Sequence, residues 1–148
     1  LYDLIQELLI QWQPLVQESK AQIVNLISPD LPLVNVDRHR LLRVYENLIM
    51  NALKHNPPGI ELIFAAEVDI RQNILRCIVA DNGVGIEATH RENLFKLYHK
   101  GKTGNSLSLG LGLYLCRQII EAHGGVMGIE TNLSVGSQFW FTLPLTPI

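Results

Sequence analysis

The chain has 148 residues, of which 47% are hydrophobic and 18% are charged, and its formal net charge is −2. Disordered chains combine low hydrophobicity with high net charge, so we predict one folded domain over residues 1–148. The near-neutral charge gives no reason to expect binding to nucleic acid or to a membrane surface. Cys77 and Cys116 both lie in apolar segments, which favours free thiols and a reducing, cytoplasmic setting. No apolar run approaches the ~18 residues of a membrane span, and because the first residue is Leu we expect a piece of a longer protein.

The hydrophobic periodicity predicts helices and strands in a mixed order. Residues 1–21 have helical spacing, although the first few are equally compatible with a short strand. Asp37 is a good N-cap for a helix that Pro57, Pro58 and Gly59 would end. The predicted helices cover residues 1–21, 38–55 and 112–123, and the predicted strands cover residues 22–28, 60–70, 74–80, 126–131 and 137–143.

The segment 81–112 differs from the rest because it holds six glycines and only a weak helical patch near 91–97. A connection of this length is usually functional or disordered. Two predicted strands follow each other directly within residues 60–80, and two more do so within residues 126–143, which indicates a partly antiparallel sheet with helices on one face. We therefore predict an α/β two-layer sandwich of about five strands and about three helices.

Polar side chains form one stripe along the predicted 38–55 helix. Arg43, Asn47, Asn51 and Lys54 follow one another at spacings of four, four and three residues, which places them on one face. The stripe is equally compatible with an ordinary solvent-exposed face. Alternatively, the Asn amide oxygens bind a hard cation such as Mg²⁺ and Lys54 binds phosphate.

Two glycine pairs lie beside predicted regular elements. Asp81 ends a strand and is followed by Gly83 and Gly85, so that Asp81 is placed to accept a hydrogen bond from an exocyclic amine while the glycines admit a flat ligand. Taken alone, this Asp-Asn-Gly sequence is more typical of a tight turn. Gly110 and Gly112 lead into the last predicted helix, where free N–H groups would favour an anion, or where the glycines would only be a flexible entry.

The order of the motifs is more specific than any of them alone. NLIMNALKH, DNGVGI, LFKLYHKG, LGLGLYLCRQIIEAHGG and GSQFWFTLPL together resemble the catalytic ATP-binding domain of bacterial sensor histidine kinases, within the wider GHKL ATPase superfamily. The resemblance is firmest from about residue 36 to residue 144. It implies the Bergerat fold, ATP and Mg²⁺ as ligands, a lid over residues 87–109, and a junction from a dimerisation domain within residues 1–21.

The resemblance also implies roles for individual residues. Asn51 matches the Mg²⁺ ligand, Asp81 matches the residue that reads adenine, and Phe95 and Tyr98 match aromatic residues that anchor the lid. Asn47 and Lys100 are implied in catalysis, with Lys100 standing where Arg is common. The full implied ATP site is Asn47, Asn51, Lys54, His55, Asp81, Gly83, Gly85, Ile86, Tyr98, Lys100, Gly110, Leu111, Gly112 and Leu113.

Position 47 bears on the type of reaction. ATP hydrolases of the superfamily usually carry a Glu general base four residues before the magnesium Asn, where this chain has Asn47, and Glu46 lies about 100° away around the helix. This favours a kinase over a hydrolase. None of the five histidines has the sequence context of the family's phosphoacceptor, so we expect the acceptor His on a separate dimerisation domain of the parent protein.

Two departures and two rival functions accompany this prediction. Ser108 and Leu109 replace residues that are usually Gly and Thr or Ser, so we expect the lid either to bend differently there or to stay disordered without ligand. The rivals are a regulatory module that binds nucleotide without phosphotransfer, and an anti-sigma-type serine kinase. We expect this chain alone to be a monomer, and the parent protein to act on a response regulator.

Overall fold

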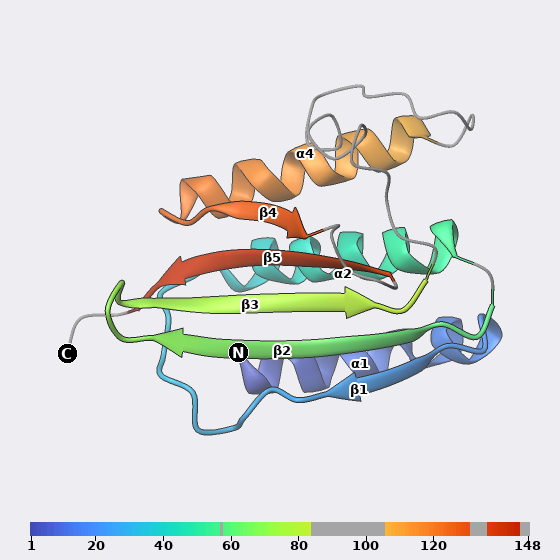
Figure 1. Cartoon of the computed structure of the whole chain (residues 1–148), viewed down its shortest axis with the longest axis horizontal. Helices are drawn as coiled ribbons and strands as arrows, with labels where there is room; N and C mark the ends of the chain where they lie inside the picture. Colours follow the sequence, from blue (N-terminus) through green and yellow to red (C-terminus); the bar gives the residue numbers. More distant parts are fainter. Residues whose placement is uncertain (57, 84–105, 131–135, 146–148) are drawn as a thin grey trace.

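A computed structural model of the chain describes residues 1–56, 58–83, 106–130 and 136–145, with only the backbone given for His55 and residues 106–111. Its centre is one five-stranded sheet with the strand order β1-β2-β3-β5-β4 (Figure 1). Strands β1 and β2 are parallel and the other pairs are antiparallel. The strands are β1 (Gln22–Asn25), β2 (Glu61–Asp69), β3 (Ile74–Asp81), β4 (Met127–Glu130) and β5 (Ser137–Pro144).

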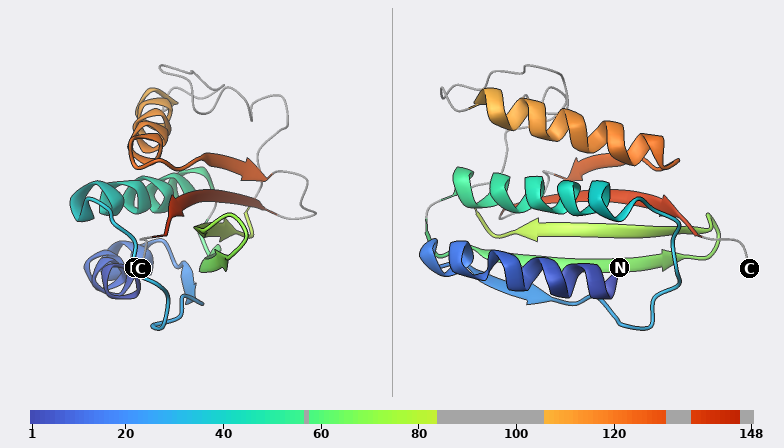
Figure 2. Two further views of the ribbon diagram at one scale, coloured as in Figure 1. Left: turned by 90° about the vertical axis from the view of Figure 1, so that its left-hand side faces the viewer. Right: turned by 180° about the vertical axis from the view of Figure 1, so that it is seen from behind.

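Three helices in the described part of the chain cover one face of this sheet, as the view from behind shows (Figure 2). They are α1 (Tyr2–Glu18), α2 (Arg38–His55) and α4 (Ser106–Ala122). Helix α2 lies in the middle and contacts both α1 and α4. The predicted two-layer sandwich with a mixed, largely antiparallel sheet is therefore confirmed.

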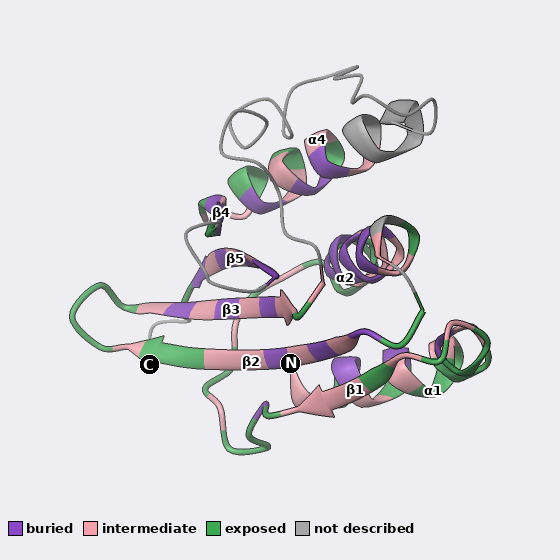
Figure 3. Ribbon diagram, turned by 45° about the vertical axis from the view of Figure 1, so that its right-hand side comes forward, coloured by how far each residue is buried: buried purple, intermediate pink, exposed green. Residues whose placement is uncertain are grey.

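The hydrophobic core lies between the helices and the sheet, where inward-facing strand residues alternate with outward-facing ones (Figure 3). Tyr45 of α2 is fully buried, and its ring centroid lies 6.1 Å from that of Phe64 and 5.4 Å from that of Phe141. Burial raises the pKa of the neighbouring Cys77 thiol to about 12. Cys77 and Cys116 are both free and buried, as the sequence predicted.

Most element boundaries agree with the sequence, because local signals set them. The Asp37 carboxylate accepts a hydrogen bond from the Arg40 N–H at 3.2 Å and caps α2. Strand β1 ends three residues before its predicted end, because the Asn25 side chain accepts a hydrogen bond from the Ile27 N–H and turns the chain. None of the helices in the described part of the chain is long and apolar enough to cross a membrane.

The start of α4 is where the prediction was wrong. We expected the helix from about residue 112, but it begins at Ser106 and includes both Gly110 and Gly112. The alternating leucines of this segment hide the helical period, and glycine is a poor residue inside a helix. The last four residues of the expected lid, 106–109, therefore belong to the first turn of α4.

Candidate functional site

Asp81 is held in place at the end of β3 by two hydrogen bonds. Its Oδ1 accepts from the Gly83 N–H at 2.9 Å, and its Oδ2 accepts from the Ser137 hydroxyl at 2.7 Å. A carboxylate has about four lone-pair sites, so Asp81 keeps the capacity to accept further hydrogen bonds. The side chain is thus fixed in direction and still able to bind a donor such as an amine.

Ser137 is a residue to which the sequence analysis gave no role. It is the first residue of β5 and pairs directly with Asp81 across the β3–β5 ladder. It is 4% exposed and occupies a core-facing position, like Phe139 and Phe141 farther along the strand. The sequence did contain a signal for this role: Ser137 is a polar residue in the alternating set of strand positions that otherwise carries core side chains, and a buried polar group needs a hydrogen-bond partner.

The turn after Asp81 lies against the end of α2. A Cβ added to Gly83 would come within 1.8 Å of the Asn56 Oδ1, so any other residue here would force the Asn56 side chain to move. The Asn56 amide in turn donates a hydrogen bond to the Ala52 carbonyl at 2.9 Å, in the last turn of α2. These contacts place the first three residues of the DNGVGI motif, 81–83, beside the C-terminal end of the NLIMNALKH motif.

Asn51 is the most informative residue of the polar stripe on α2. It is only 7% exposed, and its Oδ1 has no hydrogen-bond partner among the residues that the structure describes. A buried amide oxygen without a partner costs free energy, and such an oxygen is a suitable ligand for a hard cation. Asn51 therefore fits the predicted Mg²⁺ ligand. Arg43 and Lys54, at the two ends of the stripe, are exposed.

Asn47 lies in the interface between α2 and α4. A Cβ added to Gly112 would lie 3.1 Å from the Asn47 Oδ1, so the two helices approach closely at this point. The Cys116 thiol, one turn along α4, is near the Asn47 side chain and donates a weak bond to the Val44 carbonyl at 3.8 Å. Burial raises the pKa of this thiol to about 12, so it is neutral at physiological pH.

The structure changes the expected geometry of the glycine-rich segment. Because α4 begins at Ser106, the N–H groups of Gly110 and Gly112 belong to the hydrogen-bond ladder inside the helix and are not free at its start. The Leu113 side chain is 1% exposed and lies in the hydrophobic core. The roles of Gly110, Leu111, Gly112 and Leu113 in binding ATP remain predictions.

Several predicted residues are not tested. Gly85, Ile86, Phe95, Tyr98 and Lys100 lie outside the described residues. The side chain of His55 is likewise not described. No group of three or more His, Cys, Asp or Glu side chains in the described part of the chain is arranged to hold a metal ion.

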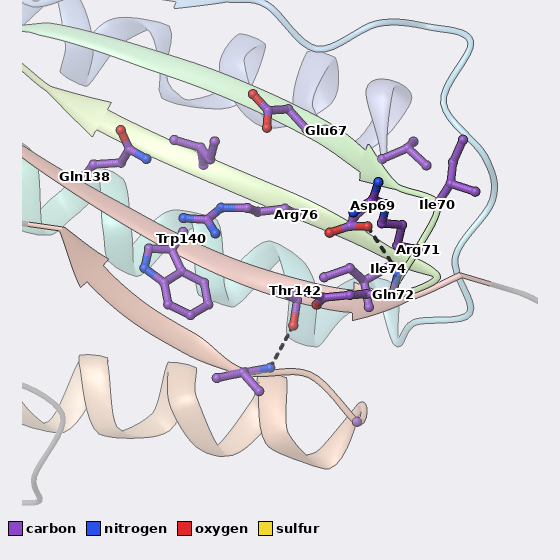
Figure 4. A pocket seen from close by; sticks show the side chains of 14 residues that line it. Glu67, Asp69, Ile70, Arg71, Gln72, Ile74, Arg76, Gln138, Trp140 and Thr142 are labelled. Carbon is purple, nitrogen blue, oxygen red and sulfur yellow. Dashed lines mark hydrogen bonds between the residues drawn. The ribbon is translucent and has the colours of Figure 1, made fainter.

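A groove on the open face of the sheet lies apart from these residues (Figure 4). It is lined from β2, β3 and β5 by outward-facing side chains, among them Arg76, whose guanidinium lies 4.7 Å from the ring centroid of Trp140. None of the predicted site residues lines it.

The comparisons with known proteins agree with this geometry. Residues 36–147 match the family model described as histidine kinase-, DNA gyrase B- and HSP90-like ATPase. The chain is 35% identical over 153 residues to the adaptive-response sensory kinase SasA of Synechococcus sp. (strain JA-3-3Ab), a match that covers 98% of this chain and 38% of SasA. It is 33% identical over 132 residues to the sensor histidine kinase WalK of Bacillus subtilis (strain 168), covering 85% of this chain and 22% of WalK.

Solved structures extend the likeness to the whole chain. The catalytic domain of the histidine kinase ThkA, in a nucleotide-free form, superposes with a TM-score of 0.84 at 26% identity, covering 99% of this chain and 95% of that one. Full-length ShkA in complex with AMPPNP superposes with a TM-score of 0.83 at 26% identity, covering 99% of this chain and 30% of that one. The chain belongs to the histidine kinase-, DNA gyrase B- and HSP90-like ATPase family, and within it to the ATP-binding catalytic domains of histidine kinases.

Proposed function

We propose that this chain positions Mg-ATP for transfer of the γ-phosphate to a histidine on a separate dimerisation domain of its parent protein. The chain spans 38% of SasA and 22% of WalK, so the activity of the parent, as a sensor kinase that acts on a response regulator, is part of the proposal. The observation that carries it is the buried Oδ1 of Asn51, which no described residue contacts with a hydrogen bond. An amide oxygen left in this state in the free protein is stabilised when a cation binds it.

Different described residues would bind the two ends of the nucleotide, the adenine and the triphosphate. Asp81, fixed by Ser137 and Gly83, would accept the hydrogen bond of the adenine amino group. Asn51 would bind Mg²⁺, which when bound neutralises charge on the phosphate oxygens. Asn47 and Lys54 would contact the triphosphate. Positioning and charge neutralisation are the main contributions that a protein makes to phosphoryl transfer.

Predicted residues that lie outside the part of the chain described by the structure, or whose side chains it does not describe, complete the proposed site. Gly85 and Ile86 would border the adenine, Tyr98 would anchor the lid, and Lys100 would stabilise charge on the transferred phosphoryl group. His55 would lie at the edge of the nucleotide, and the segment from Gly110 to Leu113 would border the phosphates.

Transfer is favoured over hydrolysis because no base is placed to activate water at position 47. The Asn47 amide has no proton-accepting group of suitable basicity, and it faces Gly112 across the helix interface. In the proposed step an imidazole nitrogen of the acceptor histidine forms a bond to the γ-phosphorus. The bond from this phosphorus to the β–γ bridging oxygen breaks, ADP leaves, and the imidazole proton passes to a base on the acceptor domain or to water.

The test has two stages. Titration calorimetry of the chain with ATP, with and without Mg²⁺, should show saturable binding that Asp81→Asn abolishes and that loses its dependence on Mg²⁺ in Asn51→Ala. Phosphotransfer to an added acceptor domain should then give an acid-labile phosphohistidine. Acid-stable phosphoserine would instead identify a serine kinase, and binding without any transfer would identify a regulatory module. A folded chain that binds no ATP at millimolar concentration would refute the proposal.

A further inference from the structure

His123, at the end of α4, uses both of its ring nitrogens. Its Nε2 accepts a hydrogen bond from the backbone N–H of Asp37 at 3.0 Å, and its Nδ1 lies 2.8 Å from the carbonyl oxygen of Ile119. A backbone N–H can only donate, so Nε2 carries no proton. Nδ1 must then carry the proton and donate it to Ile119. The two contacts therefore fix the neutral Nδ1–H tautomer of the ring.

The bond to Asp37 joins two elements that are 86 residues apart in sequence. Asp37 is the N-cap of α2, and His123 directly follows Ala122, the last residue of α4. Three contacts run along the interface of these helices: Asp37 with His123, Val44 with Cys116, and Asn47 with Gly112.

The three contacts define one antiparallel register. As the residue number rises along α2 it falls along α4 by nearly the same amount, so the contacts belong to one rigid alignment of the two helices. The first contact ties the ends of the helices together. The last contact, about ten residues or ~15 Å farther along α2, lies at the proposed phosphate site.

We propose that His123 is a positioning residue that fixes the axial register of α4 against α2. Through this register it sets the position of Gly112 against the amide of Asn47. A slip of α4 by a single residue corresponds to ~1.5 Å along the axis. Such a slip is large beside the 3.1 Å that separates a Cβ at Gly112 from the Asn47 Oδ1. The consequence for ATP rests on the proposed function, whereas the register itself does not.

Two substitutions separate the two hydrogen bonds of the ring. The amide oxygen of Gln reaches the place of Nε2, so His123→Gln keeps an acceptor for the Asp37 N–H. The amide nitrogen of Asn takes the place of Nδ1, so His123→Asn keeps the donor to Ile119 and loses the link to α2. The two variants are matched in polarity and differ in the one bond that the proposal invokes.

The first measurement is amide hydrogen exchange at Asp37, with nitrogen NMR of the imidazole in the wild-type chain. We expect an unprotonated Nε2, and exchange at Asp37 that is roughly threefold to tenfold faster in His123→Asn, the range that one net hydrogen bond contributes. The Gln variant should exchange like the wild type. Equal exchange in all three proteins, or equal acceleration in both variants, would overturn the proposal, because the ring would then act only by packing or not at all.

The second measurement is ATP affinity by calorimetry in the same three proteins. We expect a severalfold weaker affinity in His123→Asn and an unchanged affinity in His123→Gln. If the wild type binds no ATP, the proposed function fails, while exchange at Asp37 still decides the register. If exchange rises in the Asn variant but its ATP affinity is that of the wild type, the link is real and its effect on the site is refuted.

Discussion

Replacing Asn51 by leucine should make the free protein more stable while it removes the response to magnesium. Leucine has the same branching of heavy atoms as asparagine, so the change mainly removes polarity. Asn51 is 7% exposed and its Oδ1 has no partner among the described residues. In the absence of ligand this oxygen lowers the stability of the fold, and the substitution removes that cost.

The expected gain follows from two contributions. An unsatisfied buried polar group costs roughly 1–3 kcal/mol, and Leu is a better helix former than Asn by a few tenths of a kcal/mol. Allowing for imperfect packing of the new methyl groups, we expect the free energy of unfolding to rise by about 1–2 kcal/mol. For a domain of this size 1 kcal/mol shifts Tm by roughly 3 °C, so Tm should rise by about 3–6 °C.

Thermal unfolding with and without Mg-ATP measures both effects in one experiment. At one hundred times its Kd, Mg-ATP should stabilise the wild type by about 2.7 kcal/mol, and Asn51→Leu should lose the magnesium-dependent part of this shift. Asn82→Leu is the matched control, because the Asn82 Oδ1 accepts a hydrogen bond from the Glu61 N–H at 2.7 Å and its loss should lower stability. A destabilised Asn51→Leu, or one that keeps the full magnesium-dependent shift, would refute the reasoning.

Three further changes test other contacts. Ser137→Ala should lower the free energy of unfolding by about 1–2 kcal/mol in urea titrations, because the Asp81 Oδ2 loses its hydrogen-bond donor. Ser137→Thr keeps a hydroxyl donor and should retain the wild-type stability, so equal losses in both variants would contradict this explanation. Gly112→Ala should keep the free energy of unfolding within about 1 kcal/mol of the wild-type value, since the better helix propensity of Ala offsets the close contact with Asn47. The same variant should bind ATP severalfold more weakly in calorimetry, and an unchanged affinity would argue against a role for this contact. Burial raises the pKa of Cys77 from 9.0 to about 12, so as the pH rises the unfolded chain loses this proton before the folded chain does. The free energy of unfolding should therefore fall between pH 9 and 12, by up to ~1.4 kcal/mol per pH unit from this thiol. In Cys77→Ala the free energy of unfolding should fall less steeply with pH, and an unchanged slope would exclude this thiol as its source.

The fold could be predicted from the sequence where the signals are local. Helix α2 was predicted at its observed bounds, because an N-cap at Asp37 and prolines after His55 define both ends. The start of α4 was missed by six residues, because Gly110 and Gly112 were interpreted as the beginning of the helix. The close approach of α2 at Gly112 explains why a glycine is placed inside a helix here, and that approach is a tertiary contact.

The site shows the same limit of local information. The motif around Asp81 is compatible with an ordinary turn when read alone, and only the resemblance to a family gave it a function. The bond from Ser137 to Asp81 joins residues 56 positions apart, and it exists because β3 and β5 pair with these two residues opposite each other. That register depends on the whole sheet, so no short motif carries it.

The polar stripe of α2 shows what the structure adds to such a pattern. From spacing alone, a solvent-exposed face and a ligand-binding face were equally acceptable interpretations of Arg43, Asn47, Asn51 and Lys54. The structure divides the stripe, because the two charged residues are exposed, Asn47 is half-buried and Asn51 is buried. An exposed face accounts for the charged residues but not for a buried amide oxygen that has no partner in the described part of the chain. A fold keeps such a group at a cost, and the Mg²⁺ of the proposed function, by binding this oxygen, would supply the reason for it.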